Sequence, residues 1–338
     1  MKAAFYDRLG PAREVLQIAD LPDPVPAPGE VRVRIRWSGV NPSDVKSRVG
    51  LRNPVMPFPR VIPHSDGMGV VDAVGDGVPA ARIGQRVWLW NTAFKRAHGT
   101  ACERVCVPQA QAVLLPDAVD DEVGACLGVP ALTALHAVLM DGGVAGKTVL
   151  VSGGAGAVGH YAVQMASQLG AARVIATTSS EAKAALAREA GADDVVDYKT
   201  EPLARRVAEL TGGRGVDRII EVDMAANAAA NLEMLRTGGE CVVYGSGATP
   251  MPLSVTANSS KAPCSSSSMA RATTRTKPVS VNLMALPIRL DSICCRRTAS
   301  ALKSRSAVPC HSASMRSPLA RADWANRRTK ASLGSSRQ

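Results

Sequence analysis

The sequence predicts an α/β fold in which a β-rich first domain precedes a doubly wound parallel sheet, followed by a tail of atypical composition. Three observations predict it. A glycine-rich turn at 153–159 joins an apolar run to a helical pattern. Strand and helix patterns then alternate as far as residue 244. Short apolar runs separated by proline- and glycine-rich turns fill residues 1–120.

The β-rich part spans residues 1–120. Its expected strands are the runs Ala3–Tyr6, Glu30–Ser38, Gly67–Val74, Gln85–Trp90 and Ala101–Val107. The segments PDPVPAPGE at 22–30 and NPVMPFPRVIP at 53–63 lie between such runs, and prolines at this density interrupt strands and form turns. We therefore expect an all-β module rather than a flexible linker.

The glycine-rich turn follows the apolar, β-branched run Thr148–Ser152. Gly154, Gly156 and Gly159 have the GxGxxG spacing, in which the first permits a tight turn, the second lets the backbone approach a pyrophosphate and the third lets the helix pack on the strand. Ala157 and Val158 begin that helix, whose N-terminal N–H groups would face the phosphates. Glycine turns also arise for steric reasons alone, but the surrounding βαβ pattern favours a dinucleotide site formed by these five residues.

The rest of the second domain repeats this alternation. Strands are expected at Arg173–Thr177, Asp194–Asp197, Val216–Glu221 and Glu240–Tyr244, with helices at Glu181–Ala190, Glu201–Leu210 and Ala225–Leu235. Alternating strands and helices are typical of a parallel sheet covered on both faces.

Charge divides the chain unevenly. Residues 255–338 carry 15 of the 40 Lys and Arg but only 2 of the 29 Asp and Glu, so residues 1–254 hold 25 basic and 27 acidic side chains. The tail has 17 serines, one glycine and neither phenylalanine nor tyrosine. The expected domains are therefore 1–122, 123–254 and the basic tail 255–338.

The tail allows two interpretations. It is either an Arg/Ser-rich arm that binds nucleic acid through phosphates, or a disordered product of a reading-frame shift. The second is favoured, because no aromatic side chains are interleaved with the basic residues and no nucleic-acid-binding module surrounds them.

The N-terminal sequence MKAAFYDRLG leads into no long apolar run, so we expect neither a secretory signal nor a membrane span, and a cytoplasmic location. Of the eight cysteines, four lie in the tail and none forms a CxxC pair. The other four, Cys102, Cys106, Cys126 and Cys241, are expected to be reduced and partly buried.

Residues 1–254 resemble the medium-chain dehydrogenase/reductase superfamily, and within it the zinc-free quinone oxidoreductases related to zeta-crystallin. The resemblance is carried by PxPxPGEVRVRI (24–35), GVNPSD (39–44), VIPHSDGMGVVDAVGDGV (61–78), GQRVW (84–88), GTACERV (99–105), LPDAV (115–119), GVPALTALHAV (128–138), the glycine turn, EAGADDVVDY (189–198) and GGECVVYG (238–245). It implies a GroES-like β-barrel domain, a Rossmann domain and an active site in the cleft between them.

The resemblance also bears on metal. Zinc-dependent members have cysteine at the position of Asn41 and histidine at that of Ser65, and neither residue here is a good zinc ligand. His64 lies one residue early, at the glycine position of the family. No metal is therefore expected, and without a Lewis acid hydride delivery to an electron-poor acceptor is favoured over simple alcohol oxidation.

The cofactor is expected to be NADPH. Sites for NAD present an acid after the second strand, whereas this chain has Ser179 and Ser180 there. Glu181 fits a Thr178-x-x-Glu181 capping box instead. Ser179, Lys183 and Tyr198 match the 2′-phosphate contacts of the quinone oxidoreductases that the chain resembles.

At the reactive end the resemblance points to Thr133 as the carboxamide partner and to Gly245 and Ser246 beside the nicotinamide. Asn41 is the polar group expected near the substrate carbonyl, although an Asx turn before Pro42 explains it almost as well. Thr133 has a similar alternative as a helix residue bonded to its own backbone. Asn41 and Thr133 are the predicted catalytic residues of a direct hydride transfer from NADPH to a quinone or the β-carbon of an enone.

Two alternatives remain: a zinc-independent carbonyl or alcohol dehydrogenase, and a nucleic-acid-binding protein acting through the tail. The expected partner is a small-molecule quinone or enone, with no membrane and no nucleic acid. The family forms homodimers, but residues after 254 show no sixth strand and no return segment, so low stability and weak or absent dimerisation are expected.

Overall fold

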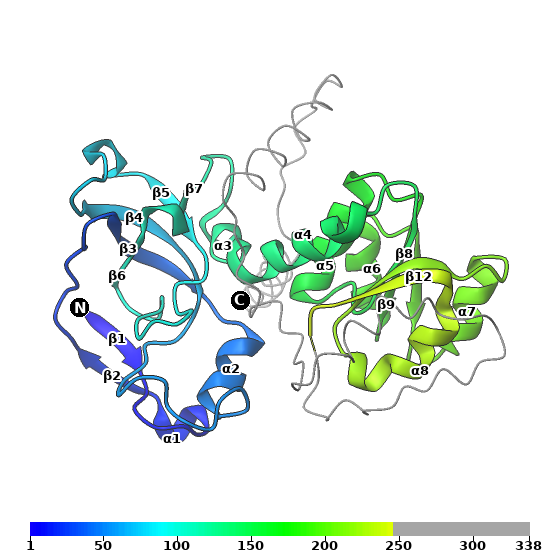
Figure 1. Ribbon diagram of the computed structural model, residues 1–338, viewed down its shortest axis with the longest axis horizontal. Coiled ribbons are helices and arrows are strands. Elements are labelled where there is room, and N and C mark those ends of the chain that lie inside the picture. Colours follow the sequence, from blue (N-terminus) through cyan, green and yellow to red (C-terminus); the bar gives the residue numbers. More distant parts are fainter. Residues whose placement is uncertain (246–338) are drawn as a thin grey trace, which may run out of the picture. The chain divides into compact units, whose positions relative to one another are not determined.

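The computed structural model describes residues 1–245, and the basic tail lies outside them (Figure 1). Their contacts divide them into two compact units, Met1–Val129 and a second that starts at Pro130. The position expected for the domain boundary, between residues 122 and 123, falls within helix α3 (Asp121–Gly124).

The first unit is built on an antiparallel five-stranded sheet with the order β6-β3-β4-β5-β7. Its strands are β3 (Glu30–Gly39), β4 (Asp66–Val74), β5 (Arg86–Leu89), β6 (Arg104–Pro108) and β7 (Ala112–Leu114). A separate antiparallel pair, β1 (Lys2–Phe5) and β2 (Gln17–Asp20), completes the strands of this unit. The helices are α1 (Ala12–Val15), α2 (Pro42–Arg48) and α3, with short 3₁₀ turns at Ala80–Arg82 and Gln109–Gln111.

The alternation of buried and more exposed side chains along β3 shows why this segment is a strand. Val31 and Val33 are fully buried, while the intervening Arg32 and Arg34 point to the other face. Val71, Val87 and other apolar side chains of the neighbouring strands pack against them in one core. The five predicted strands are thus confirmed, and the sequence pattern missed β2 and β7, which are short and partly exposed.

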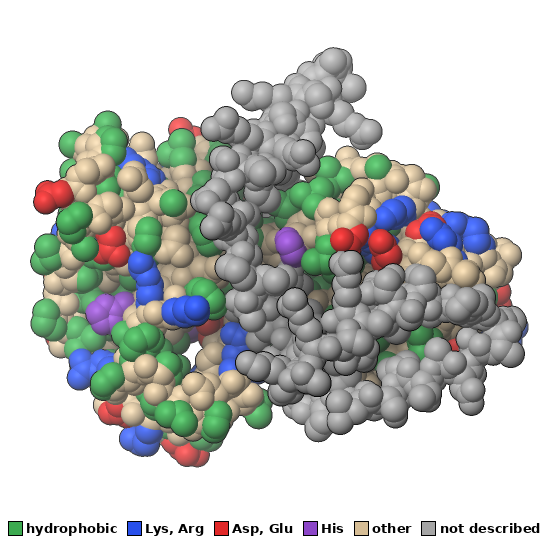
Figure 2. Space-filling model, viewed as in Figure 1, with side chains coloured by type: hydrophobic (Ala, Val, Ile, Leu, Met, Phe, Trp, Pro, Cys, Tyr) green, Lys and Arg blue, Asp and Glu red, His purple; other side chains and the backbone are tan. Residues whose placement is uncertain are grey.

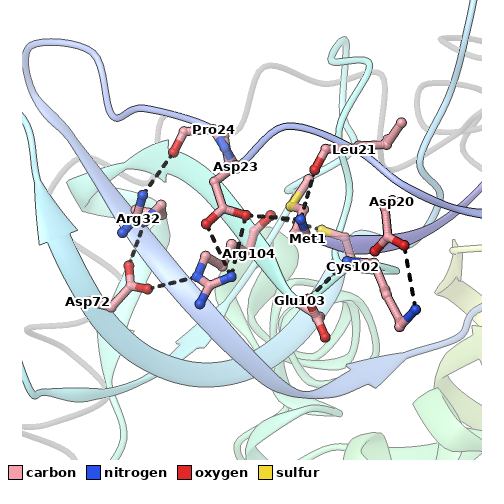
Figure 3. A network of polar contacts seen from close by, with 11 residues as sticks. Met1, Asp20, Leu21, Asp23, Pro24, Arg32, Asp72, Cys102, Glu103 and Arg104 are labelled. Atoms are coloured by element: carbon pink, nitrogen blue, oxygen red, sulfur yellow. Dashed lines mark hydrogen bonds and ion pairs between the residues drawn. The ribbon is translucent and has the colours of Figure 1, made fainter.

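Ion pairs cover the outer face of this sheet (Figure 3). Asp72 on β4 accepts from Arg32 on β3 at 2.8 Å and from Arg104 on β6 at 3.3 Å. Arg104 also contacts Asp23 at 3.2 Å, and Asp23 pairs with the Met1 amino group at 3.1 Å. These side chains are partly exposed, so each pair contributes little, but together they join three strands to the segment after β2.

The second unit is a parallel five-stranded sheet with the order β10-β9-β8-β11-β12. Its strands are β8 (Thr148–Val151), β9 (Arg173–Thr178), β10 (Asp194–Asp197), β11 (Val216–Glu221) and β12 (Leu235–Val243). The helices are α4 (Leu132–Leu139), α5 (Ala157–Gln168), α6 (Glu181–Glu189), α7 (Leu203–Leu210) and α8 (Met224–Met234), with a π-turn at Leu127–Ala131 before α4 and a 3₁₀ turn at Met140–Gly142 after it.

The two faces of β8 bury side chains against different helices. Val149 and Val151 belong to a core with residues of α4, α5 and α6. Leu150, on the opposite face, packs with residues of α7 and α8. The predicted doubly wound parallel sheet is therefore confirmed, and full burial on both faces explains the uninterrupted apolar run.

No helix within residues 1–245 is long and apolar enough to cross a membrane. Figure 2 shows Lys and Arg side chains interspersed with Asp and Glu over the described part of the face it presents. The four cysteines of this part, Cys102, Cys106, Cys126 and Cys241, are free and partly buried, as predicted.

Candidate functional site

The glycine turn links β8 to α5 with no room for side chains at two positions. A Cβ atom on Gly154 would lie 2.6 Å from the Cβ of Ala176, and one on Gly159 would lie 2.1 Å from the carbonyl oxygen of Gly153. Gly156 is the N-cap of α5, and no side chain of the described residues caps this helix. The first-turn N–H groups of α5 are therefore left for a ligand, as a pyrophosphate site requires.

Thr177 holds this turn and was missed in the sequence. Its hydroxyl accepts the N–H of Gly153 at 3.0 Å, and its carbonyl accepts the N–H of Gly154 at 3.0 Å. Thr177 is only 3% exposed, at the carboxyl end of β9. Its place opposite the turn depends on the pairing of β8 with β9, which strand patterns do not specify.

The three residues predicted to contact a 2′-phosphate lie at the carboxyl ends of β9 and β10. Lys183 Nζ donates to Ser179 Oγ at 2.9 Å, which joins the start of α6 to the end of β9. The Tyr198 N–H donates to the Thr178 carbonyl at 3.1 Å, and the Tyr198 side chain is 49% exposed. The backbone thus brings a cation and two hydroxyl groups to one edge of the sheet.

The expected capping box at Glu181 is wrong. Ser180 is the N-cap of α6, and no side-chain capping bond is formed. The Glu181 carboxylate instead accepts a hydrogen bond from the Arg188 guanidinium at 2.7 Å, seven residues farther along the same helix. The long Glu181 side chain finds a cation farther along the helix, and this pair offsets its negative charge beside the site.

Asn41 is buried in the first unit, where it is the N-cap of α2. Its backbone N–H donates to Asp44 Oδ2 at 2.7 Å, and its Nδ2 donates to Asp66 Oδ2 at 2.7 Å. Asn41 therefore has a structural role at the start of α2. A primary amide has two N–H groups, so the second remains available as a donor.

Asp66 is a second residue that the sequence patterns did not indicate. It is 1% exposed, and its Oδ1 accepts the Val129 N–H at 2.8 Å. Burial raises the pKa of Asp66 to about 7, against the opposing effect of its hydrogen bonds. A buried carboxylate is thus held against the amide of Asn41.

Asp66 makes stability depend on pH. Its folded-state pKa lies above the ordinary 3.8, so the folded chain binds this proton more tightly than the unfolded chain. The stability from this group is full below about pH 4 and is lost as the pH rises to about 7. We expect the free energy of unfolding to fall between pH 5 and 8 by on the order of 3 kcal/mol more in the native chain than in Asp66→Asn. Urea titrations of both proteins at the two pH values measure this difference, and equal pH dependence would contradict it.

Ser65 and His64, the residues compared above with a zinc ligand position, make other contacts in the structure. Ser65 is 7% exposed, and its carbonyl accepts the Thr92 N–H at 3.0 Å. His64 has a φ of 77°, in the region that favours glycine, and its Nδ1 lies 2.9 Å from Ser38 Oγ. Within residues 1–245, no three His, Cys, Asp or Glu side chains are grouped to hold a metal ion.

Two other predicted residues lie in the second unit. Thr133 is half-buried in the first turn of α4, and among the described residues its hydroxyl has no hydrogen-bond partner. Gly245 follows β12, where a Cβ atom would lie 2.6 Å from the Val222 carbonyl oxygen at the end of β11. Ser246 lies outside the described residues.

The sequence matches two family models. Residues 27–117 match the alcohol dehydrogenase GroES-like domain, and residues 157–280 match the zinc-binding dehydrogenase domain. These matches include parts of both compact units, in the order expected from the sequence.

Curated relatives and solved structures agree with the two family models. The human quinone oxidoreductase is 32% identical over 240 residues, which cover 70% of each chain. A solved NAD-dependent alcohol dehydrogenase is 34% identical, with a TM-score of 0.69 over 75% of this chain and 80% of its own. The Escherichia coli quinone oxidoreductase, solved in complex with NADPH, is 28% identical, with a TM-score of 0.65 over 73% of each chain.

Proposed function

The chain belongs to the medium-chain dehydrogenase/reductase superfamily and is quinone oxidoreductase-like, and from this premise we propose that it transfers hydride from NADPH to a quinone or an α,β-unsaturated carbonyl without zinc. The observation that carries the cofactor assignment is the Lys183–Ser179 pair beside Tyr198 at the sheet edge. A cation and hydroxyl groups suit a 2′-phosphate, whereas the acid at the start of α6, Glu181, is bonded to Arg188.

The cofactor would lie across the carboxyl ends of the strands. Gly154, Gly156, Ala157, Val158 and Gly159 would hold the pyrophosphate, because the turn leaves backbone N–H groups free and carries no obstructing side chain. The pairing of Thr177 with Gly153 and Gly154 would keep the turn in this shape.

When bound, NADPH supplies the hydride. Thr133, whose hydroxyl has no hydrogen-bond partner among the described residues, would orient the carboxamide, and Gly245 would border the nicotinamide ring. Ser246, the other residue predicted there, lies outside the described residues. Hydride transfer to a quinone or enone would leave negative charge on the acceptor oxygen. The second N–H of Asn41 would donate to that oxygen, and solvent would deliver the final proton.

The donor set does not fit zinc. Asn41 donates its amide to Asp66 instead of presenting a thiolate, and Ser65 carries a hydroxyl where an imidazole would be needed. Activity that is insensitive to chelators would agree with this proposal, and chelator-sensitive activity would contradict it.

We further propose that a GroES-like domain at 1–122 supplies Asn41, a Rossmann domain at 123–254 binds the cofactor, and the partner is a small molecule. A carbonyl or alcohol dehydrogenase is the second candidate, because one solved structure with this fold is named an NAD-dependent alcohol dehydrogenase. Rates with benzoquinone, naphthoquinone, an enone and simple alcohols, with and without chelator, separate the two. Oxidation of simple alcohols in preference to quinone or enone reduction would favour the second.

Replacing Lys183 tests the cofactor assignment. In Lys183→Ala the cation beside Ser179 is removed, so we expect the KM for NADPH to rise about tenfold while the KM for NADH stays within twofold. Arg205→Ala, on an exposed face of α7, is the matched control and should change neither value. An equal loss with both cofactors would contradict a 2′-phosphate contact.

A further inference from the structure

The second unit contains a fully buried carboxylate that no step above uses. Glu221, the last residue of β11, is 0% exposed. Its Oε1 accepts the Asp223 N–H at 2.6 Å and Asn227 Nδ2 at 2.9 Å, and its Oε2 accepts Asn231 Nδ2 at 2.8 Å. All three partners are neutral donors. Within residues 1–245, no Lys or Arg forms an ion pair with it, so its negative charge has no counter-charge in contact.

Glu221 lies where ligands bind in sheets of this type. In the order β10-β9-β8-β11-β12, β9 and β10 follow β8 on one side of it, and β11 and β12 lie on its other side. The direction in which strands are added across the sheet therefore reverses between β8 and β11. Ligands bind outside the carboxyl ends of the strands at such a switch point. Glu221 is at that end of β11, and the next residue, Val222, is 39% exposed.

The segments that follow the neighbouring strands β8 and β12 both contact the carboxyl end of β11. On the β8 side, the Ser152 N–H donates to the Ile220 carbonyl at 2.9 Å, directly before the glycine turn. On the β12 side, the Tyr244 N–H donates to the Glu221 carbonyl at 3.0 Å, directly before Gly245. These backbone contacts place the end of β11 between the segments proposed to hold the pyrophosphate and the nicotinamide, and the Glu221 carboxylate is bonded to residues at the start of α8 and along it.

The charge of Glu221 acts on groups around it. Burial raises the pKa of Cys241 to about 12, and repulsion by Glu221 adds to the effect. Burial likewise raises the pKa of Tyr244, again with a contribution from Glu221. The negative charge of Glu221 thus disfavours ionisation of both side chains. The same charge would favour a positively charged group near Glu221.

We propose that Glu221 is a fixed buried charge that raises the affinity of the site for the oxidised cofactor relative to the reduced cofactor. Without this charge, the preference for the oxidised cofactor would be smaller. The inference rests on the proposed function. The nicotinamide ring is neutral in NADPH and carries one positive charge once its hydride has left. A nearby anion stabilises only the charged form, so Glu221 would act as a positioning charge that favours the product side of hydride transfer.

Glu221→Gln tests this by removing the charge with little change of shape. The Asn231 Oδ1 atom is buried without a partner among the described residues, so a flip of this amide lets it accept from the new Gln side chain. Calorimetric titration gives the dissociation constants of NADP⁺ and NADPH. Attraction between single charges inside a protein is on the order of 1 to 2 kcal/mol, and about 1.4 kcal/mol changes an equilibrium tenfold, so we expect the ratio Kd(NADP⁺)/Kd(NADPH) to rise about tenfold.

Two variants separate charge from structure. Glu233→Gln removes the same charge from an exposed position on α8 and should leave the ratio unchanged. Glu221→Asp keeps the charge and should keep the ratio near the native value even if both affinities fall. Loss of both affinities by the same factor in Glu221→Gln would overturn the inference, because a merely structural residue moves both together.

A second pair of variants is available if a melting curve shows that Glu221→Gln does not fold. Val222→Lys places a cation beside the intact carboxylate, and Val222→Gln is the neutral control of comparable length. We expect a higher ratio for the lysine variant than for the glutamine variant, and equal ratios would overturn the inference. If the native chain binds neither cofactor, the proposed function fails together with this inference, whereas an unchanged ratio in the variants overturns the inference alone.

Discussion

Replacing Gly159 with alanine is expected to abolish measurable NADPH binding and to lower the free energy of unfolding by about 3 kcal/mol, since overpacking a close contact carries costs of that order. The added methyl group would lie 2.1 Å from the carbonyl oxygen and 2.8 Å from the carbonyl carbon of Gly153. Both neighbours are backbone atoms of the same tight turn and cannot rotate away. The turn must therefore open, which separates the first N–H groups of α5 from the position of the pyrophosphate.

Gly156→Ala is the matched variant, because its methyl group would lie 3.2 Å from the same oxygen. Gly156 has an ordinary φ of −77°, so the folded chain accepts alanine with a small adjustment. The methyl group would instead face the pyrophosphate, and we expect NADPH affinity to fall about 100-fold at nearly unchanged stability, the equivalent of losing about 3 kcal/mol of binding.

Fluorescence titration of NADPH and thermal unfolding of both variants check the pair of predictions. The expected result is that only Gly159→Ala loses stability. Native-like affinity in Gly156→Ala would show that no phosphate approaches the turn, and native-like stability in Gly159→Ala would show that the turn is not closed as described.

Replacing Arg218 with methionine is expected to destabilise the second unit by about 3 to 5 kcal/mol, as breaking buried charged networks usually does. Arg218 lies on β11 and is 0% exposed. It pairs with Glu240 at 2.5 Å and donates to the carbonyl groups of Val138 and Met140 at 3.3 and 2.7 Å. These carbonyls end α4, so one guanidinium group joins the sheet to the C-terminus of the helix that carries Thr133.

The consequence extends to catalysis because α4 begins with the residues proposed to orient the carboxamide. We expect Arg218→Met to lower kcat even at temperatures where the variant is folded. Urea unfolding measures the stability change, and Arg206→Met, whose partner Glu209 is exposed, is the control with a change below about 0.5 kcal/mol. A change of similar size in both variants would contradict the role of Arg218.

The elements that the sequence predicted well are those in which apolar side chains follow a regular pattern within one segment. The buried run at β8 and the alternation along β3 are each visible in one segment, and the structure has both strands within one residue of the expected bounds. The predicted strand at 240–244 was too short, because β12 starts at Leu235 in a segment with two glycines and mixed polarity. The local sequence pattern does not indicate a strand in this segment, and the segment is a strand because it pairs with β11.

The candidate site divides in the same way. The glycine spacing and the Ser179 and Lys183 positions were legible because they are neighbours in the chain. Thr177, Asp66 and Glu221 were not, because each acts on residues that only strand pairing or a loop brings near. Asp66 reaches Asn41 and Val129, which are separated from it by 25 and 63 positions.

The family, the doubly wound sheet and the glycine turn are legible in the sequence, since they depend on the order and period of nearby side chains. The use of its polar groups depends on the tertiary structure: Asn41 is bonded to a buried carboxylate, Glu181 is bonded to Arg188, and Glu221 is enclosed with no ion-pair partner among residues 1–245. The physical reason is that the cost of a buried charge and the identity of its partner depend on what surrounds it in space, and composition and spacing along the chain do not contain that information.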